Sequence, residues 1–98
     1  MMRFRRMAWV ALLVEAITRR GFDEDSNFYF YGKYVETFPT LDSSETLHVS
    51  VYTSNRDMVL SFDFNFETRE LKVDEYATPK IYDKLIRSFR RYYHVKVI

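Results

Sequence analysis

The sequence lacks cysteine altogether and has only two glycines, two prolines and two histidines in 98 residues. Without cysteine, the chain forms no disulfide bridges, thiolate metal sites or cysteine nucleophiles. Gly21 and Gly32 stand too far apart to build the glycine-rich loops that hold phosphate groups. No serine stands in a G-x-S-x-G motif or near an evident catalytic triad, and the two histidines, His48 and His94, are distant in sequence. We therefore expect a protein that is not an enzyme and has no metal site and no cofactor.

Apolar residues, in contrast, are abundant: 47% of the chain is hydrophobic and 18% is aromatic. That content offsets chain entropy, so residues 1–98 are expected to fold as a single domain. The basic start and the apolar run that ends at Val14 resemble a signal peptide, but the run is short and Glu15 interrupts it. It is also too short to span a bilayer. We expect a cytoplasmic protein without membrane contact, and we leave monomer and homodimer open.

Two segments have the spacing of amphipathic helices. In residues 4–20 an apolar stripe recurs every three or four positions, and Gly21 suits the end of a helix: Met7, Val10, Leu13, Val14, Ile17. Trp9 and Leu12 lie off this stripe, against either another part of the fold or a partner. Thr78 and Pro79 then start a second helix over residues 79–93. Its apolar face consists of Ile81, Tyr82, Leu85, Ile86, Phe89, Tyr92 and Tyr93.

The middle of the chain has the alternation of strands. Strands are predicted at 27–37, with Gly32 at a bulge or a close backbone approach, and at 46–53, 58–66 and 70–75, with a short fifth strand left open in 94–98. Residues 38–45, which contain Pro39, read as a loop, and 54–57 as a turn. The order αββββα predicts an α+β fold of two layers. A four-stranded antiparallel meander would carry the N- and C-terminal helices on one face.

Charge is segregated along the chain although the formal net charge is only +1. Residues 1–20 have a net charge of +4, residues 21–78 of −8, and residues 79–98 of +5. Such asymmetry is found in proteins that bind nucleic acid or a charged partner, and also where basic helices and an acidic sheet attract each other within one fold.

The sheet face opposite the helices is the first candidate surface, because it combines tyrosine with acidic groups. We expect it to bind a protein partner through Tyr52, Asp63, Asn65, Asp74 and the acidic segment Asp23, Glu24, Asp25.

That acidic segment matches the first half of a calcium-binding EF-hand loop, but Phe28 and Tyr34 replace the required glycine and glutamate. Non-catalytic α+β proteins of this size include phage and mobile-element inhibitors, such as anti-CRISPR factors and immunity proteins. We therefore expect an inhibitor or accessory factor that acts on a basic or nucleic-acid-handling protein.

The alternative function is nucleic-acid binding, for which the second predicted helix would provide the surface. Its face opposite the apolar one is basic and matches the pattern by which cations follow phosphates: Lys80, Lys84, Arg87, Arg90, Arg91.

Overall fold

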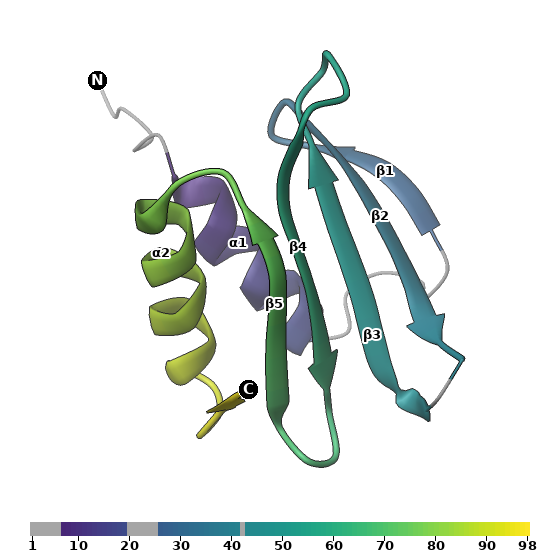
Figure 1. Cartoon of the computed structure of the whole chain (residues 1–98), viewed down its shortest axis with the longest axis vertical. Coiled ribbons are helices and arrows are strands. Elements are labelled where there is room, and N and C mark those ends of the chain that lie inside the picture. Colours follow the sequence, from purple (N-terminus) through teal and green to yellow (C-terminus); the bar gives the residue numbers. More distant parts are fainter. Residues whose placement is uncertain (1–6, 20–25, 42) are drawn as a thin grey trace.

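The alternation of polar and apolar residues builds one sheet with two helices beside it (Figure 1). The computed structural model describes residues 7–19, 26–41 and 43–98. Its elements, in chain order, are α1 (Ala8–Thr18), β1 (Ser26–Phe30), β2 (Lys33–Thr40), β3 (Ser43–Tyr52), β4 (Met58–Asn65), β5 (Glu70–Tyr76), α2 (Pro79–Arg90) and β6 (Lys96–Val97). Strands β1 to β5 form an antiparallel meander, and β6 pairs in parallel with β5 at the edge.

The expected α+β class and the meander are confirmed, but the count of four strands and the order αββββα are wrong. The predicted strand 27–37 is a hairpin, in which β1 pairs with β2 and Phe30 faces Lys33. Tyr31 and Gly32 turn the chain with φ angles of 50° and 77°. Two positive φ angles suit the twist of a two-residue hairpin, so Gly32 belongs to a turn and not to a bulge. The surrounding aromatic residues, which favour strands, conceal this turn in the sequence.

The predicted loop at 38–45 is largely strand. β2 continues through Pro39 to Thr40, and β3 begins at Ser43. Pairing with β1 stops at Thr37, so Pro39 lies where β2 has a neighbour on one side alone among the described strands. Proline is tolerated at such an edge because no ladder bond needs its missing N–H, and the register shifts directly after it.

The C-terminal tail forms the short additional strand that its alternation indicates. The amide of Lys96 donates to the carbonyl of Arg69 at 2.9 Å, and that of Ile98 donates to Leu71 at 3.0 Å. This strand follows α2, so it runs parallel to β5, unlike every other pair in the sheet.

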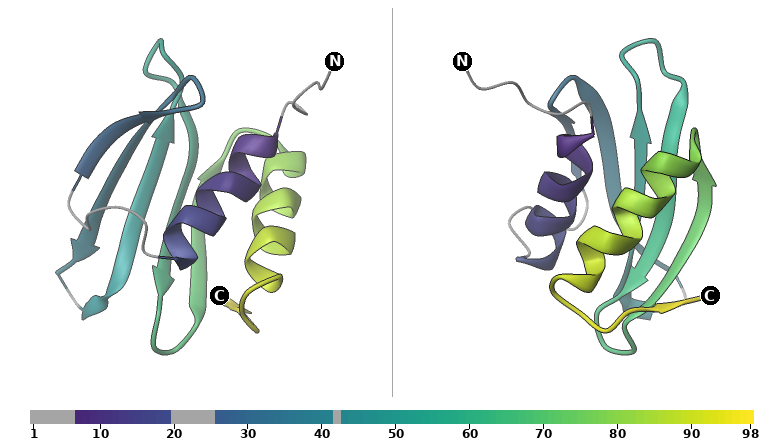
Figure 2. Two further views of the ribbon diagram at one scale, coloured as in Figure 1. Left: turned by 180° about the vertical axis from the view of Figure 1, so that it is seen from behind. Right: turned by 90° about the vertical axis from the view of Figure 1, so that its left-hand side faces the viewer.

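Both helices lie on one side of the sheet, as expected (Figures 1 and 2). In the apolar stripe of α1, Val10, Leu13, Val14 and Ile17 are buried and Met7 is partly buried. Residues 4–6 and 20 of the predicted helix, and Gly21 after it, lie outside the described residues. In α2, Thr78 caps the helix by accepting from the amide of Ile81 at 3.3 Å. The ring of Phe89 packs on Phe62 and Phe64 of β4, with centroids 5.7 and 4.6 Å apart.

The structure decides between the two alternatives for Trp9 and corrects the position expected for Tyr92. Trp9 is only 6% exposed, so the fold itself covers it, with the Lys33 ammonium 5.4 Å from its ring centroid. Tyr92 follows the end of α2 and is 43% exposed, whereas its neighbour Tyr93 packs on Phe64. The apolar face of the second helix is therefore shorter than its sequence pattern. No helix within the described residues combines the length and the hydropathy that crossing a membrane requires.

The ring contacts of Phe89 predict a large stability effect. Phe89→Ala is expected to lower the free energy of unfolding by about 3–5 kcal/mol, because it leaves a cavity between α2 and β4. Tyr92→Ala truncates an aromatic side chain that is 43% exposed just after the end of α2, and is expected to cost about 0.5 kcal/mol. Urea denaturation of the two variants measures the difference, and equal losses would contradict the packing described.

Candidate functional site: the outer face of the sheet

The sheet face that neither helix covers is the candidate site, and we call it the outer face. The register of the strands determines which residues lie on this face. Two residues that pair across neighbouring strands point their side chains to the same side of the sheet. The outer face includes Tyr29 of β1; Tyr34, Glu36 and Phe38 of β2; His48, Ser50 and Tyr52 of β3; Ser61, Asp63 and Asn65 of β4; and Lys72, Asp74 and Glu75 of β5.

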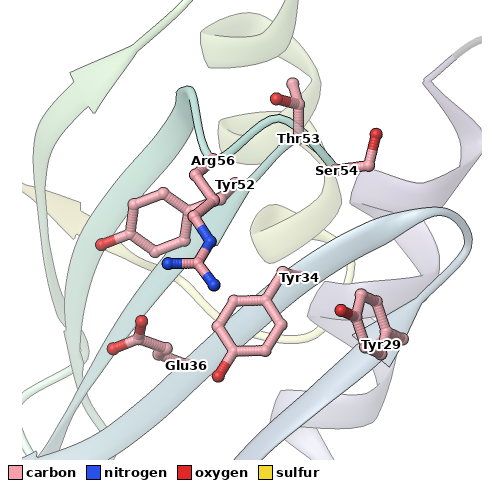
Figure 3. Close-up of a pocket in the computed structure, with 7 residues that line it drawn as sticks. All are labelled: Tyr29, Tyr34, Glu36, Tyr52, Thr53, Ser54 and Arg56. Atoms are coloured by element: carbon pink, nitrogen blue, oxygen red, sulfur yellow. The ribbon is translucent and has the colours of Figure 1, made fainter.

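Three tyrosines form a row across the outer face. Tyr29 lies edge-on to Tyr34, with ring centroids 5.4 Å apart, and Tyr34 lies 6.4 Å from Tyr52. The row exists because the register aligns Tyr29 with Tyr34 and Tyr34 with Tyr52. The rings line a pocket of about 560 Å³ together with Glu36, Thr53, Ser54 and Arg56 (Figure 3). Tyr29 is 78% exposed, so a large aromatic surface is available to a partner.

A turn brings a cation to this pocket. The Thr53 amide donates to the carbonyl of Asp57 at 2.9 Å, and the Arg56 amide donates to that of Thr53 at the same distance. The hydroxyl of Thr53 accepts from the Asp57 amide at 3.1 Å. These bonds hold Arg56 at a φ of 68°, and its guanidinium group extends over the pocket between Tyr52 and Tyr34 (Figure 3).

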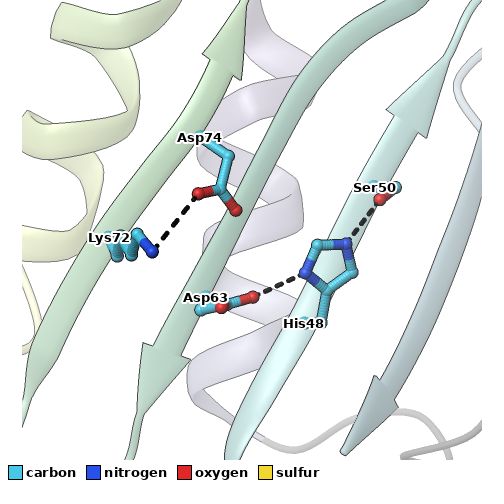
Figure 4. A network of polar contacts seen from close by, with 5 residues as sticks. All are labelled: His48, Ser50, Asp63, Lys72 and Asp74. Atoms are coloured by element: carbon cyan, nitrogen blue, oxygen red, sulfur yellow. Dashed lines mark hydrogen bonds and ion pairs between the residues drawn. The ribbon is translucent and has the colours of Figure 1, made fainter. Parts of the chain in front are cut away.

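A polar network occupies the adjoining part of the outer face (Figure 4). The Nδ1 atom of His48 lies 2.5 Å from the Oδ1 atom of Asp63, and its Nε2 atom lies 2.7 Å from the Oγ atom of Ser50. Phe38 stacks on the imidazole ring at a centroid distance of 4.7 Å. On β5, the Lys72 ammonium lies 3.9 Å from a carboxylate oxygen of Asp74. The imidazole is therefore held on both nitrogens and on one face.

This arrangement corrects the expectation that no serine lies near a triad, since Asp63, His48 and Ser50 follow one another as acid, base and hydroxyl. Two features separate it from a hydrolytic site. Ser50 is only 5% exposed. It also lies in β3, paired with β2 and β4 on both sides, so the backbone amides around it are used in the ladder instead of being free to stabilise an oxyanion. The contacts position the imidazole ring instead.

The sequence-predicted residues are only partly brought together. Tyr52, Asp63 and Asp74 lie on the outer face as expected, whereas Asp23, Glu24 and Asp25 lie outside the described residues. Asn65 reaches the same face, but its side chain is occupied by structural bonds: Nδ2 donates to Thr46, and Oδ1 accepts from the amides of Glu67 and Thr68 at 2.8 and 2.7 Å.

Sequence reasoning missed six of the seven residues that line the pocket: Tyr29, Tyr34, Glu36, Thr53, Ser54 and Arg56. The first three belong to the hairpin that was read as one strand. Recognising Tyr31-Gly32 as a turn would have placed Tyr29 opposite Tyr34. No sequence signal fixes the position of Arg56, which depends on the hydrogen bonds of its turn.

The basic residues of the second helix form a separate surface on and beyond α2. Lys80, Arg87, Arg90 and Arg91 are exposed, and Lys84 is half-buried. Among the described residues, none of these five cations lies within ion-pairing distance of a carboxylate. Arg87 donates instead to the carbonyl of Asp83 at 3.4 Å.

The bonds of Asn65 predict that this residue stabilises the fold. Asn65→Ala is expected to lower the free energy of unfolding by about 1–3 kcal/mol, because it leaves amide groups of the β4–β5 turn without their acceptor. Asn65→Asp keeps that acceptor and removes only the bond to Thr46, so it is expected to cost less. Thermal denaturation of both variants checks this order of stability losses. If Asn65→Ala is as stable as the wild type, the structural role is contradicted and Asn65 is again a candidate for partner binding.

Comparison of the chain with protein-family models, with curated proteins and with solved structures finds no match. The function is therefore argued from the outer face and from α2.

Proposed function

We propose that this protein is a small non-catalytic protein-binding module, an inhibitor or accessory factor, that docks a basic segment of its partner on the outer face. The observation that carries the proposal is the row of three tyrosines, which lines a pocket beside carboxylate groups on a sheet face that neither helix covers.

Tyrosine is suited to such a surface for energetic reasons. Its ring provides a large apolar contact with few rotatable bonds, and its hydroxyl group satisfies a hydrogen bond, so tyrosine is enriched where binding energy concentrates. In this protein the ring contacts between Tyr29, Tyr34 and Tyr52 hold the side chains in place before a partner arrives. Less side-chain entropy is then lost on binding.

The charge of the outer face favours a basic partner. The four carboxylates of the face, Glu36, Asp63, Asp74 and Glu75, outnumber the cations Arg56 and Lys72. Arginine side chains of a partner stack on tyrosine rings and pair with carboxylates, which the pocket offers together in Tyr34 and Glu36. A nucleic-acid-handling protein presents such basic segments, and the opposite charges accelerate the encounter.

The tyrosine row predicts a selective loss of partner capture. Tyr29→Ser combined with Tyr34→Ser is expected to abolish capture of a specific basic protein from extract of the native host, measured by affinity chromatography with mass spectrometry. The loss arises because both aromatic walls of the pocket are removed.

The matched control is Tyr76→Ser combined with Tyr92→Ser, two tyrosines that are also exposed and lie off the outer face. This control is expected to capture the same protein as the wild type. Capture by the outer-face variant at the wild-type level, with its fold verified by circular dichroism, rejects the proposal.

A second candidate function, nucleic-acid binding through α2, is favoured by its five cations that lack carboxylate partners among the described residues. Unpaired cations along a helix are available to phosphate groups, whose binding releases counterions. Tyr92, exposed beside Arg91, adds an aromatic ring on which a base can stack.

Charge reversal tests this candidate. Replacing Lys80, Arg87 and Arg91 by glutamate is expected to abolish binding to a fluorescent DNA oligonucleotide at low salt, measured by anisotropy. Each phosphate contact removed should lower the slope of log K against log salt by about one. The same charge change at Arg56, Arg69 and Lys72 should weaken binding far less. Equal losses in both triple variants, or a wild type that does not bind, contradict the candidate.

A further inference from the structure

We propose that the outer face also binds one divalent transition-metal ion, with His48, Asp63 and Asp74 as its ligands. This inference goes beyond the proposed function, because it concerns the isolated chain and requires no partner. One imidazole nitrogen with two carboxylate oxygens is a donor set typical of zinc and related ions.

The three side chains converge from three neighbouring strands, β3, β4 and β5 (Figure 4). One ligand atom of each lies within 4.8 Å of the other two. Zinc bonds of about 2.0–2.2 Å place ligand atoms about 3–3.5 Å apart. The His48 nitrogen and the Asp63 oxygen, now 2.5 Å apart, would separate slightly, while the exposed carboxylate of Asp74 would move closer. Both adjustments are small side-chain rotations.

An irregularity in β5 brings Asp74 to this position. Val73 pairs with Phe62 and Glu75 pairs with Ser61, so Asp74 is an additional residue with no partner of its own on β4. Such a bulge reorients a side chain at the cost of one regular pair. Here it directs Asp74 across β4 toward the side on which Asp63 and His48 lie (Figure 4).

The surroundings of His48 correspond to the outer shell of a metal site. When a histidine binds a metal through one nitrogen, its other N–H usually donates to a fixed acceptor, which sets the tautomer. The Oγ atom of Ser50 is in place as that acceptor at 2.7 Å, and Phe38 fixes the plane of the ring. In the metal-free protein Nδ1–H donates to the Asp63 carboxylate and Nε2 accepts from Ser50; a metal ion bound at Nδ1 would replace that proton and leave Nε2–H to donate to Ser50.

Ser61 is a further polar residue beside the cluster: it is only 5% exposed and lies two positions before Asp63, opposite Ser50. At present Lys72 is the cation next to Asp74, at 3.9 Å, and its exposed side chain is readily displaced.

The test is titration of the chelator-treated protein with Zn²⁺ by isothermal calorimetry. The wild type is expected to bind one ion per chain, and Asp74→Asn to weaken the affinity at least tenfold. Ser50→Ala, which removes the orienting acceptor, is expected to weaken it about tenfold. Lys72→Gln is expected to tighten it several-fold, because a competing positive charge is removed. That gain separates metal binding from a merely structural role of the cluster.

The controls are His94→Ala and Asp57→Asn, two exposed residues of the same types away from the cluster. Both should leave the affinity unchanged. Asp74 is exposed, so the metal-free Asp74→Asn variant should keep the unfolding temperature of the wild type. Wild-type protein that binds no zinc, or an affinity that depends on His94 and not on Asp74, overturns the proposal. Either result leaves partner capture by the tyrosine row unaffected.

Discussion

The packing of Phe89 from α2 on Phe62 and Phe64 of β4 is the contact on which the rest of the structure depends. It fixes α2 to one side of the sheet, where the apolar stripe of α1 completes the same core. Once both helices share that side, the opposite side is left without a helical cover (Figure 2). The polar and aromatic residues that alternate with the core then lie on the side of the sheet away from the helices.

The outer face divides into two regions that differ in chemistry. Toward the β1–β2 turn it is aromatic, with the tyrosine row and the pocket that Arg56 overhangs. Toward β5 it is polar, with His48 held between Asp63 and Ser50. The first region offers contact area and the second offers charge and metal-binding atoms. The two regions meet on β3, where Tyr52 and Ser50 are two residues apart on the same face. A partner docked on the tyrosines would therefore approach the polar region.

The segregation of charge along the chain corresponds to separate surfaces. The basic C-terminal part contains the cations of α2, none of which pairs with a carboxylate among the described residues. The acidic middle part contains the strands whose carboxylates lie on the outer face. Within the described residues, the interpretation that basic helices and an acidic sheet neutralise each other has no ion pair to support it.

The sequence by itself determined the class of fold, the buried stripe of α1, the central part of that of α2, and the Thr78 cap. It also determined the two faces of the central strands, because each face follows from the local spacing of residues such as Val49 and His48. It also placed Tyr52, Asp63 and Asp74 on one surface. Only the tertiary structure decided the Tyr31-Gly32 hairpin, the bulge at Asp74 and the contact of His48 with Asp63. These features depend on register between strands distant in sequence. A shift of one residue would reverse every face, and local patterns do not encode that register.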